Sequence, residues 1–252
     1  MKTFQNIFIP VVVCCMFIFF ACNDTSVLGP NEIGGETNLE LTKVGGEFVA
    51  NFYSETWNPG FDHQKDTAIT TKNDNGVINI HVRSGFDSVF INMIDSLLGT
   101  KDLPKDIKSA MVDKYLKKYG VTIDTNNKAK MHAEFDLKMK VTSEGIQEYM
   151  TSGGDMSKPY TIIKYSANVG DKYEFTDPDG VKITRTVVSK STTDDYYMGF
   201  WLIKVLKIEQ TKEDPIIDKI TYITNHKYGL VGVILQTKNG QVFRLGIFPP
   251  NS

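Results

Sequence analysis

Cysteine is scarce in this chain, and all of it lies near the N-terminus. The 252 residues contain three cysteines, Cys14, Cys15 and Cys22, so the chain from Asn23 onward has none. Without a cysteine, a folded domain has neither a disulfide nor a thiol nucleophile, and its stability has to come from a hydrophobic core. The hydrophobic share of 41% and the length are sufficient for such a core.

The sequence also lacks an excess of charge of either sign. Its 28 Lys and Arg residues nearly balance 30 Asp and Glu residues, which leaves a formal net charge of −2, and no long basic run occurs. Proteins that bind nucleic acid depend on a basic surface that contacts phosphates. We therefore expect no nucleic-acid partner.

The common signatures of active sites are missing as well. The sequence has no Gly-x-Ser-x-Gly elbow, no His-Glu-x-x-His motif and no glycine-rich phosphate loop. We expect no cofactor and no metal, and we favour a non-enzymatic protein while leaving an enzyme open. A hydrolase would require carboxylates or histidines that converge in one pocket, and it is the least favoured alternative.

The histidines offer incomplete metal sites. His63 lies in a polar segment that is typical of a solvated loop. His81 and His132 fall on the polar faces of two predicted strands and would approach each other if these strands were neighbours. Zinc requires at least a third ligand, for which Glu134 is the one candidate on the same face. We interpret both residues as solvent-facing strand histidines.

The N-terminus has the pattern of an export signal. Lys2 precedes an almost wholly apolar run over residues 7–20, small Ala21 comes next, and polar residues follow Cys22. This order is typical of a cleaved signal peptide. The run is shorter than the roughly 20 residues that a membrane-spanning helix needs, so a permanent transmembrane anchor is the alternative.

The junction Phe19-Phe20-Ala21-Cys22 resembles the lipobox of bacterial lipoproteins, although Phe19 stands where the usual box has an aliphatic residue. The resemblance implies that residues 1–21 are removed and that the Cys22 thiol carries diacylglycerol. Palmitate-type chains would then hold the protein on a membrane, since two or three chains bind far more firmly than one. Asn23 rather than Asp follows the cysteine, which by the same resemblance implies the outer membrane and leaves its periplasmic or surface face open. An ordinary signal peptide is the alternative.

The remainder is predicted to form a tether and one domain. Residues 22–38 contain Gly29-Pro30 and Gly34-Gly35 among polar residues, a composition typical of a flexible linker. Residues 39–252 show no internal repeat and no break in composition. We predict a single β-rich globular domain there.

The most regular stretch of that domain covers residues 130–142. Apolar and polar residues alternate without a break, which predicts a β-strand with one buried face. At about 3.3 Å per residue it would be roughly twice as long as a common strand, and such strands belong to strongly twisted or curled sheets.

Other segments show either strand or helix periodicity. Alternation predicts further strands over residues 39–42, 47–53, 78–83, 160–165, 172–175, 181–190, 199–210, 216–224, 229–237 and 241–248. Hairpin turns are expected at residues 73–76, 177–180 and 238–240. Apolar residues at helical spacing predict helices over 87–99 and 103–120, with a short helix over 143–150. The predicted class is α+β and β-rich: a curved antiparallel meander like an open half-barrel, with two helices packed on one face.

This architecture is similar to the half-barrel of lipoprotein-localisation factors and related lipid-carrying lipoproteins. Residues 169–175 and 227–233 also resemble recurring phrases of an uncharacterised family of secreted lipoproteins. The resemblance implies a bacterial outer-membrane lipoprotein and brings no catalytic residues with it.

Soft side chains surround the predicted apolar face. Methionine suits an adaptable cavity as well as a plain core. If the face binds an apolar ligand, such as a lipid or an acylated partner, it would be lined by Met93, Met111, Met131, Phe135, Leu137 and Met139. The alternative binding function is capture of a surface glycan by Trp57 or by the aromatic and acidic residues 194–201, and it would require exposed, coplanar rings.

Overall fold

The computed structural model describes residues 32–54, 67–85, 104, 106–107, 110, 122–124, 132–199 and 201–249, and of residues 51–54, 84–85 and 123–124 only the backbone. All of its strands lie in one compact unit, Ile33–Ser252, and Met1–Glu32 forms a second unit. The elements, in chain order, are the 3₁₀ turn η1 (Glu40–Thr42) and the strands β1 (Glu47–Ser54), β2 (Thr67–Asp74), β3 (Val77–Gly85), β4 (Thr122–Asp124), β5 (His132–Thr142), β6 (Gly145–Glu148), β7 (Tyr160–Lys164), β8 (Lys172–Thr176), β9 (Lys182–Lys190), β10 (Tyr196–Tyr197), β11 (Leu202–Ile203), β12 (Leu206–Lys212), β13 (Ile217–Asn225), β14 (Gly229–Thr237) and β15 (Val242–Phe248).

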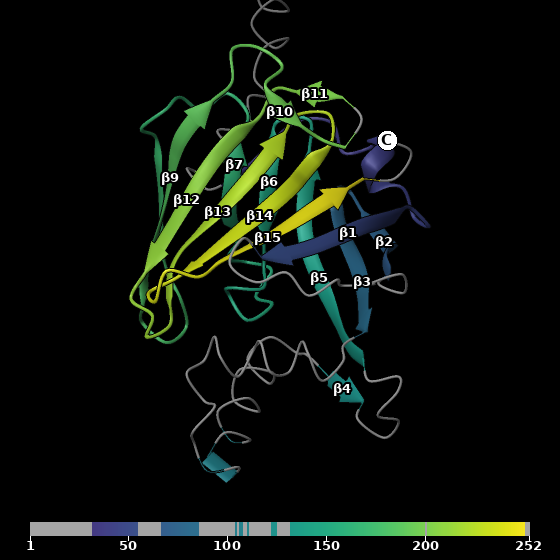
Figure 1. The fold of residues 1–252 in the computed structure, drawn as a ribbon. Helices are drawn as coiled ribbons and strands as arrows, with labels where there is room; N and C mark the ends of the chain where they lie inside the picture. Colours follow the sequence, from purple (N-terminus) through teal and green to yellow (C-terminus); the bar gives the residue numbers. More distant parts are fainter. Residues whose placement is uncertain are drawn as a thin grey trace, which may run out of the picture. The chain divides into compact units, whose positions relative to one another are not determined.

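Nearly all of these strands belong to one antiparallel sheet. Its order is β7-β6-β5-β3-β2-β1-β15-β14-β13-β12-β9-β8, β4 pairs with the start of β5, and β10 and β11 form a separate hairpin. The sheet curls until it is nearly closed, like a barrel (Figure 1). The two ends of the order, β7 and β8, face each other: the Tyr160 hydroxyl donates to the Thr176 carbonyl, and the Lys164 N–H donates to the Tyr173 hydroxyl at 3.1 Å.

The α+β prediction is wrong. In the part of the chain that the structure describes, regular structure is almost entirely β, helical geometry is confined to η1 and to Asp106, Ile107 and Ala110, and no helix covers the sheet. The two helices predicted over 87–99 and 103–120 lie almost wholly outside the described residues. The curled sheet buries its own apolar face, so the layer of helices that a flat sheet would need is replaced by the opposite wall of the same sheet.

Two short predictions are also wrong. Residues 143–150 form a turn and strand β6 rather than a helix, because Gly145 lets β6 approach β7 closely: a Cβ on Gly145 would lie 2.3 Å from the Ile163 carbonyl oxygen. Residues 39–42 form η1 rather than a strand. The Thr42 hydroxyl there donates to the carbonyls of Thr37 and Leu39, which holds a local turn.

The long strand, the C-terminal meander and all three hairpin turns are confirmed. β5 covers His132–Thr142, and from β12 to β15 each strand pairs with the next along the chain. Asn75 and Gly76 both have positive φ, 49° and 85°, as the turn between β2 and β3 requires. Residues 199–210, predicted as one strand, divide between β11 and β12.

Local irregularities accompany the curvature. Register shifts interrupt the ladders of β2 with β3, β6 with β7, β9 with β12, and β13 with β14. A β-bulge bends its strand and increases the local twist, which helps a sheet to close.

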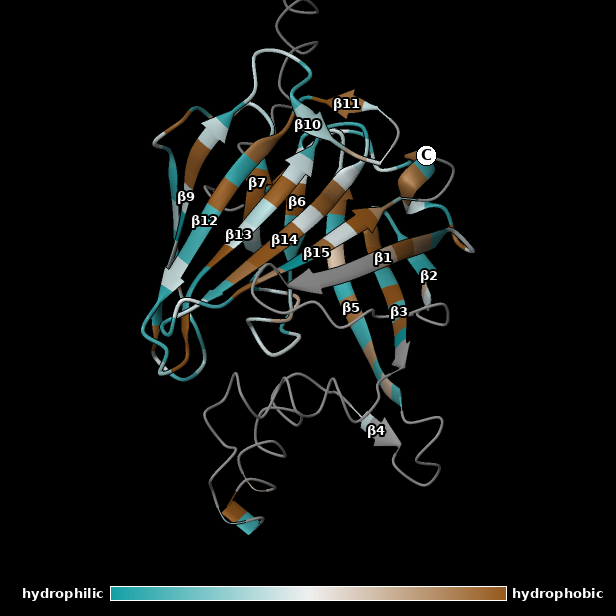
Figure 2. Ribbon diagram, viewed as in Figure 1, coloured by the Kyte–Doolittle hydropathy of each residue, from teal (hydrophilic) through white to brown (hydrophobic). Residues whose placement is uncertain are grey.

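The main core lies inside the curl. It joins Ile78 and Met139, on β3 and β5, to Val187 and Ile208, on β9 and β12, although these strand pairs lie far apart in the sheet order. Such residues can pack together only across the interior. In Figure 2, apolar and polar bands alternate along β3, β5 and β12 to β14, as one buried and one exposed face require.

A second apolar cluster lies on the outer face of the sheet. Met198 and Ile203, in and beside the β10–β11 hairpin, are 3% and 6% exposed, and they pack with Ile223 and Val231 of β13 and β14. Trp201 also packs against this cluster, with its ring 6.4 Å from that of Tyr228. The hairpin therefore covers an apolar patch that the curled sheet leaves outside.

Candidate functional site

The candidate apolar site is the inner face of β3 and β5. These strands pair so that Ile78 opposes Met139, Ile80 opposes Leu137 and Val82 opposes Phe135. Ile78 and Met139 are buried within the main core, whereas Leu137, Val82 and Phe135 are only half-buried. The apolar face is therefore sealed near the end of β5 and becomes more accessible toward its beginning.

Half-buried apolar residues also face the interior from β14 and β15. Tyr222 packs against the main core, and its cross-strand partner Val233 opposes Leu245, so all three share the inner face. Val233 and Leu245 are half-buried. Accessible apolar surface inside the curl thus belongs to two parts of the sheet.

The structure brings together three of the residues predicted to bind a ligand. Phe135, Leu137 and Met139 alternate along one face of β5. Met93, Met111 and Met131, together with Cys22 and Trp57, lie outside the described residues.

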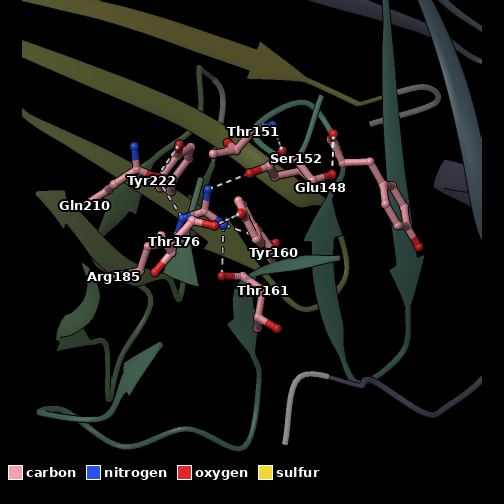
Figure 3. A network of polar contacts seen from close by, with 10 residues as sticks. Glu148, Thr151, Ser152, Tyr160, Thr161, Thr176, Arg185, Gln210 and Tyr222 are labelled. Atoms are coloured by element: carbon pink, nitrogen blue, oxygen red, sulfur yellow. Dashed lines mark hydrogen bonds and ion pairs between the residues drawn. The ribbon is translucent and has the colours of Figure 1, made fainter. Parts of the chain in front are cut away.

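A polar network that the sequence analysis missed crosses the interior where β7 and β8 meet (Figure 3). Arg185 of β9 is fully buried, and its Nη2 donates to Glu148 Oε1 at 2.7 Å. Its Nη1 donates to the carbonyls of Tyr160 and Thr161 at 3.1 and 3.0 Å, and its Nε donates to Gln210 Oε1 at 2.7 Å. One guanidinium thus joins β9 to β6, β7 and β12.

The surroundings of Arg185 complete the network. The guanidinium carbon lies 5.4 Å from the ring centres of both Phe175 and Tyr222, and the Tyr222 hydroxyl donates to Gln210 Oε1 at 3.2 Å. The second oxygen of Glu148 accepts from the Thr151 N–H at 2.8 Å. A buried ion pair can be tolerated when both partners have such additional contacts.

Two tyrosines strengthen this junction between β7 and β8. Burial raises the pKa of Tyr160, and the carboxylates of Asp177 and Glu148 raise it further. Burial likewise raises the pKa of Tyr173, against the opposing effect of the Lys164 N–H. Both phenols therefore remain protonated, and Tyr160 can donate to the Thr176 carbonyl over the ordinary pH range.

The signal for this network was present in the alternation of β9. Ile183, Arg185 and Val187 occupy successive inward positions, so an arginine stands where the pattern requires an apolar residue. A charged residue in phase with a buried face predicts a buried, paired charge. Its partner Glu148, 37 residues earlier, carried no such signal.

His81, His132 and Glu134 do not converge on a zinc site. β3 and β5 are neighbours, but His81 opposes Asp136 and His132 opposes Gly85. The two histidines therefore lie four positions apart along the ladder. His81 Nδ1 lies 3.0 Å from Asp136 Oδ1, and His132 Nε2 lies 3.3 Å from Glu134 Oε1. Within the described residues no group of three metal-ligating side chains converges.

In the aromatic and acidic segment, residues 194–201, two of the three described rings pack against the sheet. Tyr196 and Trp201 are half-buried and pack against the outer cluster, whereas the Tyr197 side chain is exposed, at 67%.

The turn after β8 is a polar hairpin turn: Asp177 Oδ1 accepts from the N–H groups of Asp179 and Val181, both at 2.9 Å.

Comparison of the chain with family models, with curated proteins and with solved structures finds no match. Among the described residues, no helix has the length and apolar character needed to cross a membrane.

Proposed function

We propose that this protein is a lipid-anchored envelope lipoprotein whose curled sheet binds an apolar ligand, such as a lipid or an acylated partner. The observation that carries the proposal is the gradient of exposure along β3 and β5, from buried Ile78 and Met139 to half-buried Val82 and Phe135. No catalytic role is part of the proposal.

The gradient has a direct energetic meaning. Each Å² of apolar surface taken out of water is worth about 25 cal/mol, so a ligand that covers Val82, Phe135 and Leu137 gains free energy from residues already ordered by the sheet. The same reasoning applies to Val233 and Leu245. A preformed wall adds little ordering cost on binding.

Attachment to the outer membrane rests on the sequence around Cys22. The apolar run, small Ala21 and the single cysteine retained after cleavage support acylation of that thiol.

Glycan capture has less support. Tyr196 and Trp201 pack against the sheet, which leaves Tyr197 as the exposed ring among the described aromatic residues of segment 194–201.

Native mass spectrometry of the full chain purified from a bacterial host, followed by organic extraction, tests ligand binding. We expect a co-purifying lipid that is lost in Phe135→Asp and retained in Lys138→Asp, which places the same charge on the exposed face of the same strand. Circular dichroism would establish that both variants fold. A ligand-free wild-type mass, or equal lipid in both variants, would contradict the proposal.

The anchor is tested separately by the mass of the N-terminal peptide. Acylation predicts a peptide that begins at Cys22 and carries diacylglycerol. A peptide that begins elsewhere with an unmodified thiol would contradict this half of the proposal and leave the ligand site unaffected.

A further inference from the structure

The N-terminal segment joins the sheet at one identifiable end. Glu36 and Ser143 are linked twice, by the Glu36 N–H to the Ser143 hydroxyl and by the Ser143 N–H to the Glu36 carbonyl, both at 2.9 Å. Thr37 lies against Gly76. Residues 36–37 therefore cross the β2–β3 and β5–β6 turns, and we call the end of the sheet that carries these turns the anchor end.

Other loops lie at the anchor end. β13 runs antiparallel to β14, and their turn lies beside η1, since Leu41 contacts the position of Gly229. The β10–β11 hairpin packs next to this turn through Trp201 and Tyr228 (Figure 1). The β7–β8 connection is tied to the β5–β6 turn by the Tyr165 N–H, which donates to the Glu144 carbonyl at 2.9 Å.

Large apolar side chains project into solvent from these same loops. Tyr197 and Leu202 oppose each other across the β10–β11 hairpin, with 67% and 53% of their surfaces exposed. Val169, in the β7–β8 connection, is 60% exposed. Two connections of the anchor end thus present apolar groups, while Met150 and Met156, in the β6–β7 connection at the other end, are exposed to smaller fractions, 40% and 45%.

We propose that the anchor end rests on the surface of a phospholipid bilayer, with Tyr197, Leu202 and Val169 in its interfacial layer. This inference rests on the lipid attachment proposed above. The ten residues 23–32 span at most about 36 Å when fully extended, so an acylated Cys22 would hold the sheet near the membrane by this end.

The chemistry of the loops matches a bilayer interface. Tyrosine has an apolar ring and a polar hydroxyl, a combination favoured at the boundary between lipid and water. Exposed Asp194 and Asp195 precede the hairpin and would be repelled by anionic headgroups, so the structure favours a zwitterionic surface.

The half-buried apolar wall near Val82 and Phe135 lies toward the start of β5, at the end of the sheet opposite the anchor end. It would then face away from this membrane.

Depth measurements with single spin labels test the proposal. In a chain that is cleaved before an acylated Cys22, Cys14 and Cys15 are removed and the Cys22 thiol is blocked, so Tyr197→Cys, Leu202→Cys and Val169→Cys each provide the one free thiol for labelling. Lys238→Cys is the matched control, because it lies in the β14–β15 turn at the opposite end of β14. Each protein is reconstituted on phosphatidylcholine–phosphatidylethanolamine vesicles, and the collision rates with oxygen and with a water-soluble nickel chelate are compared.

We expect the ratio of oxygen to nickel collisions to be several-fold higher at the three anchor-end sites than at Lys238. Aqueous ratios at all four sites in an acylated, vesicle-bound protein would overturn the docking while leaving the anchor intact. Protection from both reagents would indicate a protein contact and would also overturn it. If the protein carries no acyl group, the same labels are placed in a chain whose Cys14, Cys15 and Cys22 are replaced by serine. High ratios in that protein would support the docking while the anchor is refuted, and aqueous ratios would refute both.

Discussion

Arg185 and Glu148 form a buried ion pair, Nη2 to Oε1 at 2.7 Å, between strands that are separated by most of the sheet order. Their side chains are 0% and 9% exposed. β7 and β8, the two ends of the sheet, share no ladder in the described structure, so this pair and its partners hold the closure where backbone pairing stops. Closure therefore depends on a few side chains.

Removal of the arginine should be strongly destabilising. Arg185→Met leaves Glu148 buried without its cationic partner, and the expected loss is about 3–5 kcal/mol in the free energy of unfolding. Chemical denaturation followed by circular dichroism measures it.

Two controls separate this effect from a general loss of charge. Lys182→Met, on the same strand, breaks an exposed pair with Glu174 and should cost less than about 1 kcal/mol. Arg185→Met combined with Glu148→Leu should regain much of the loss, since the unpaired charge is gone. Equal losses in the two single variants would contradict a role for the buried pair.

Asp214 should make stability depend on acid pH. Burial alone would raise its pKa, but the N–H groups of Ile217 and Ile216, both 2.9 Å from Oδ1, together with Lys212, lower it below its usual value. Because the folded pKa is depressed, this contribution is complete above about pH 4 and is lost as the pH falls through the folded value.

Asp214→Asn should therefore be less stable than the wild type at pH 7, with a difference that shrinks as the pH falls below 4. Urea denaturation at pH 7, 4 and 3 measures this trend. Exposed Asp218→Asn changes the net charge equally and should leave stability nearly unchanged. A difference for Asp214→Asn that is constant with pH would contradict the assignment.

Gly145→Ala should loosen the pairing of β6 with β7. The new Cβ would lie 2.3 Å from the Ile163 carbonyl oxygen, so the two backbones must separate, at a cost of about 1–3 kcal/mol. Hydrogen exchange should accelerate at the amides of β7. Gly240→Ala has open space around it and a positive φ of 84°, so it should strain only its own turn and leave β7 protected. Unchanged exchange in β7 of Gly145→Ala would refute this.

The β10–β11 hairpin should be held by its inward face alone. Ile203→Ala removes a side chain that is 6% exposed in the outer cluster and should cost about 2–4 kcal/mol. Its neighbour Leu202→Ala, on the exposed face, should change stability by less than about 0.5 kcal/mol. Thermal and urea denaturation compare the pair, and a larger loss for Leu202→Ala would reverse the assigned orientation.

Much of the strand content could be predicted because it is local. Alternation over residues 130–142 requires one face of β5 to be buried, whatever the partner strand. The Asn75-Gly76 turn is equally local, since its positive φ angles suit these residue types. Of the predicted apolar site, Phe135, Leu137 and Met139 share a face for the same reason.

Tertiary structure alone decided how the sheet covers its apolar face and which charges lie inside it. Period-2 alternation says that a face is buried but not by what, and within the described residues it is the opposite wall of the curled sheet that packs against it. The pairing of Arg185 with Glu148 depends on strand order and curvature, which arise from contacts distant in sequence. The sequence by itself determined which residues face inward; closure of the sheet determined what they meet, because only folding brings β6, β7, β9 and β12 around one point.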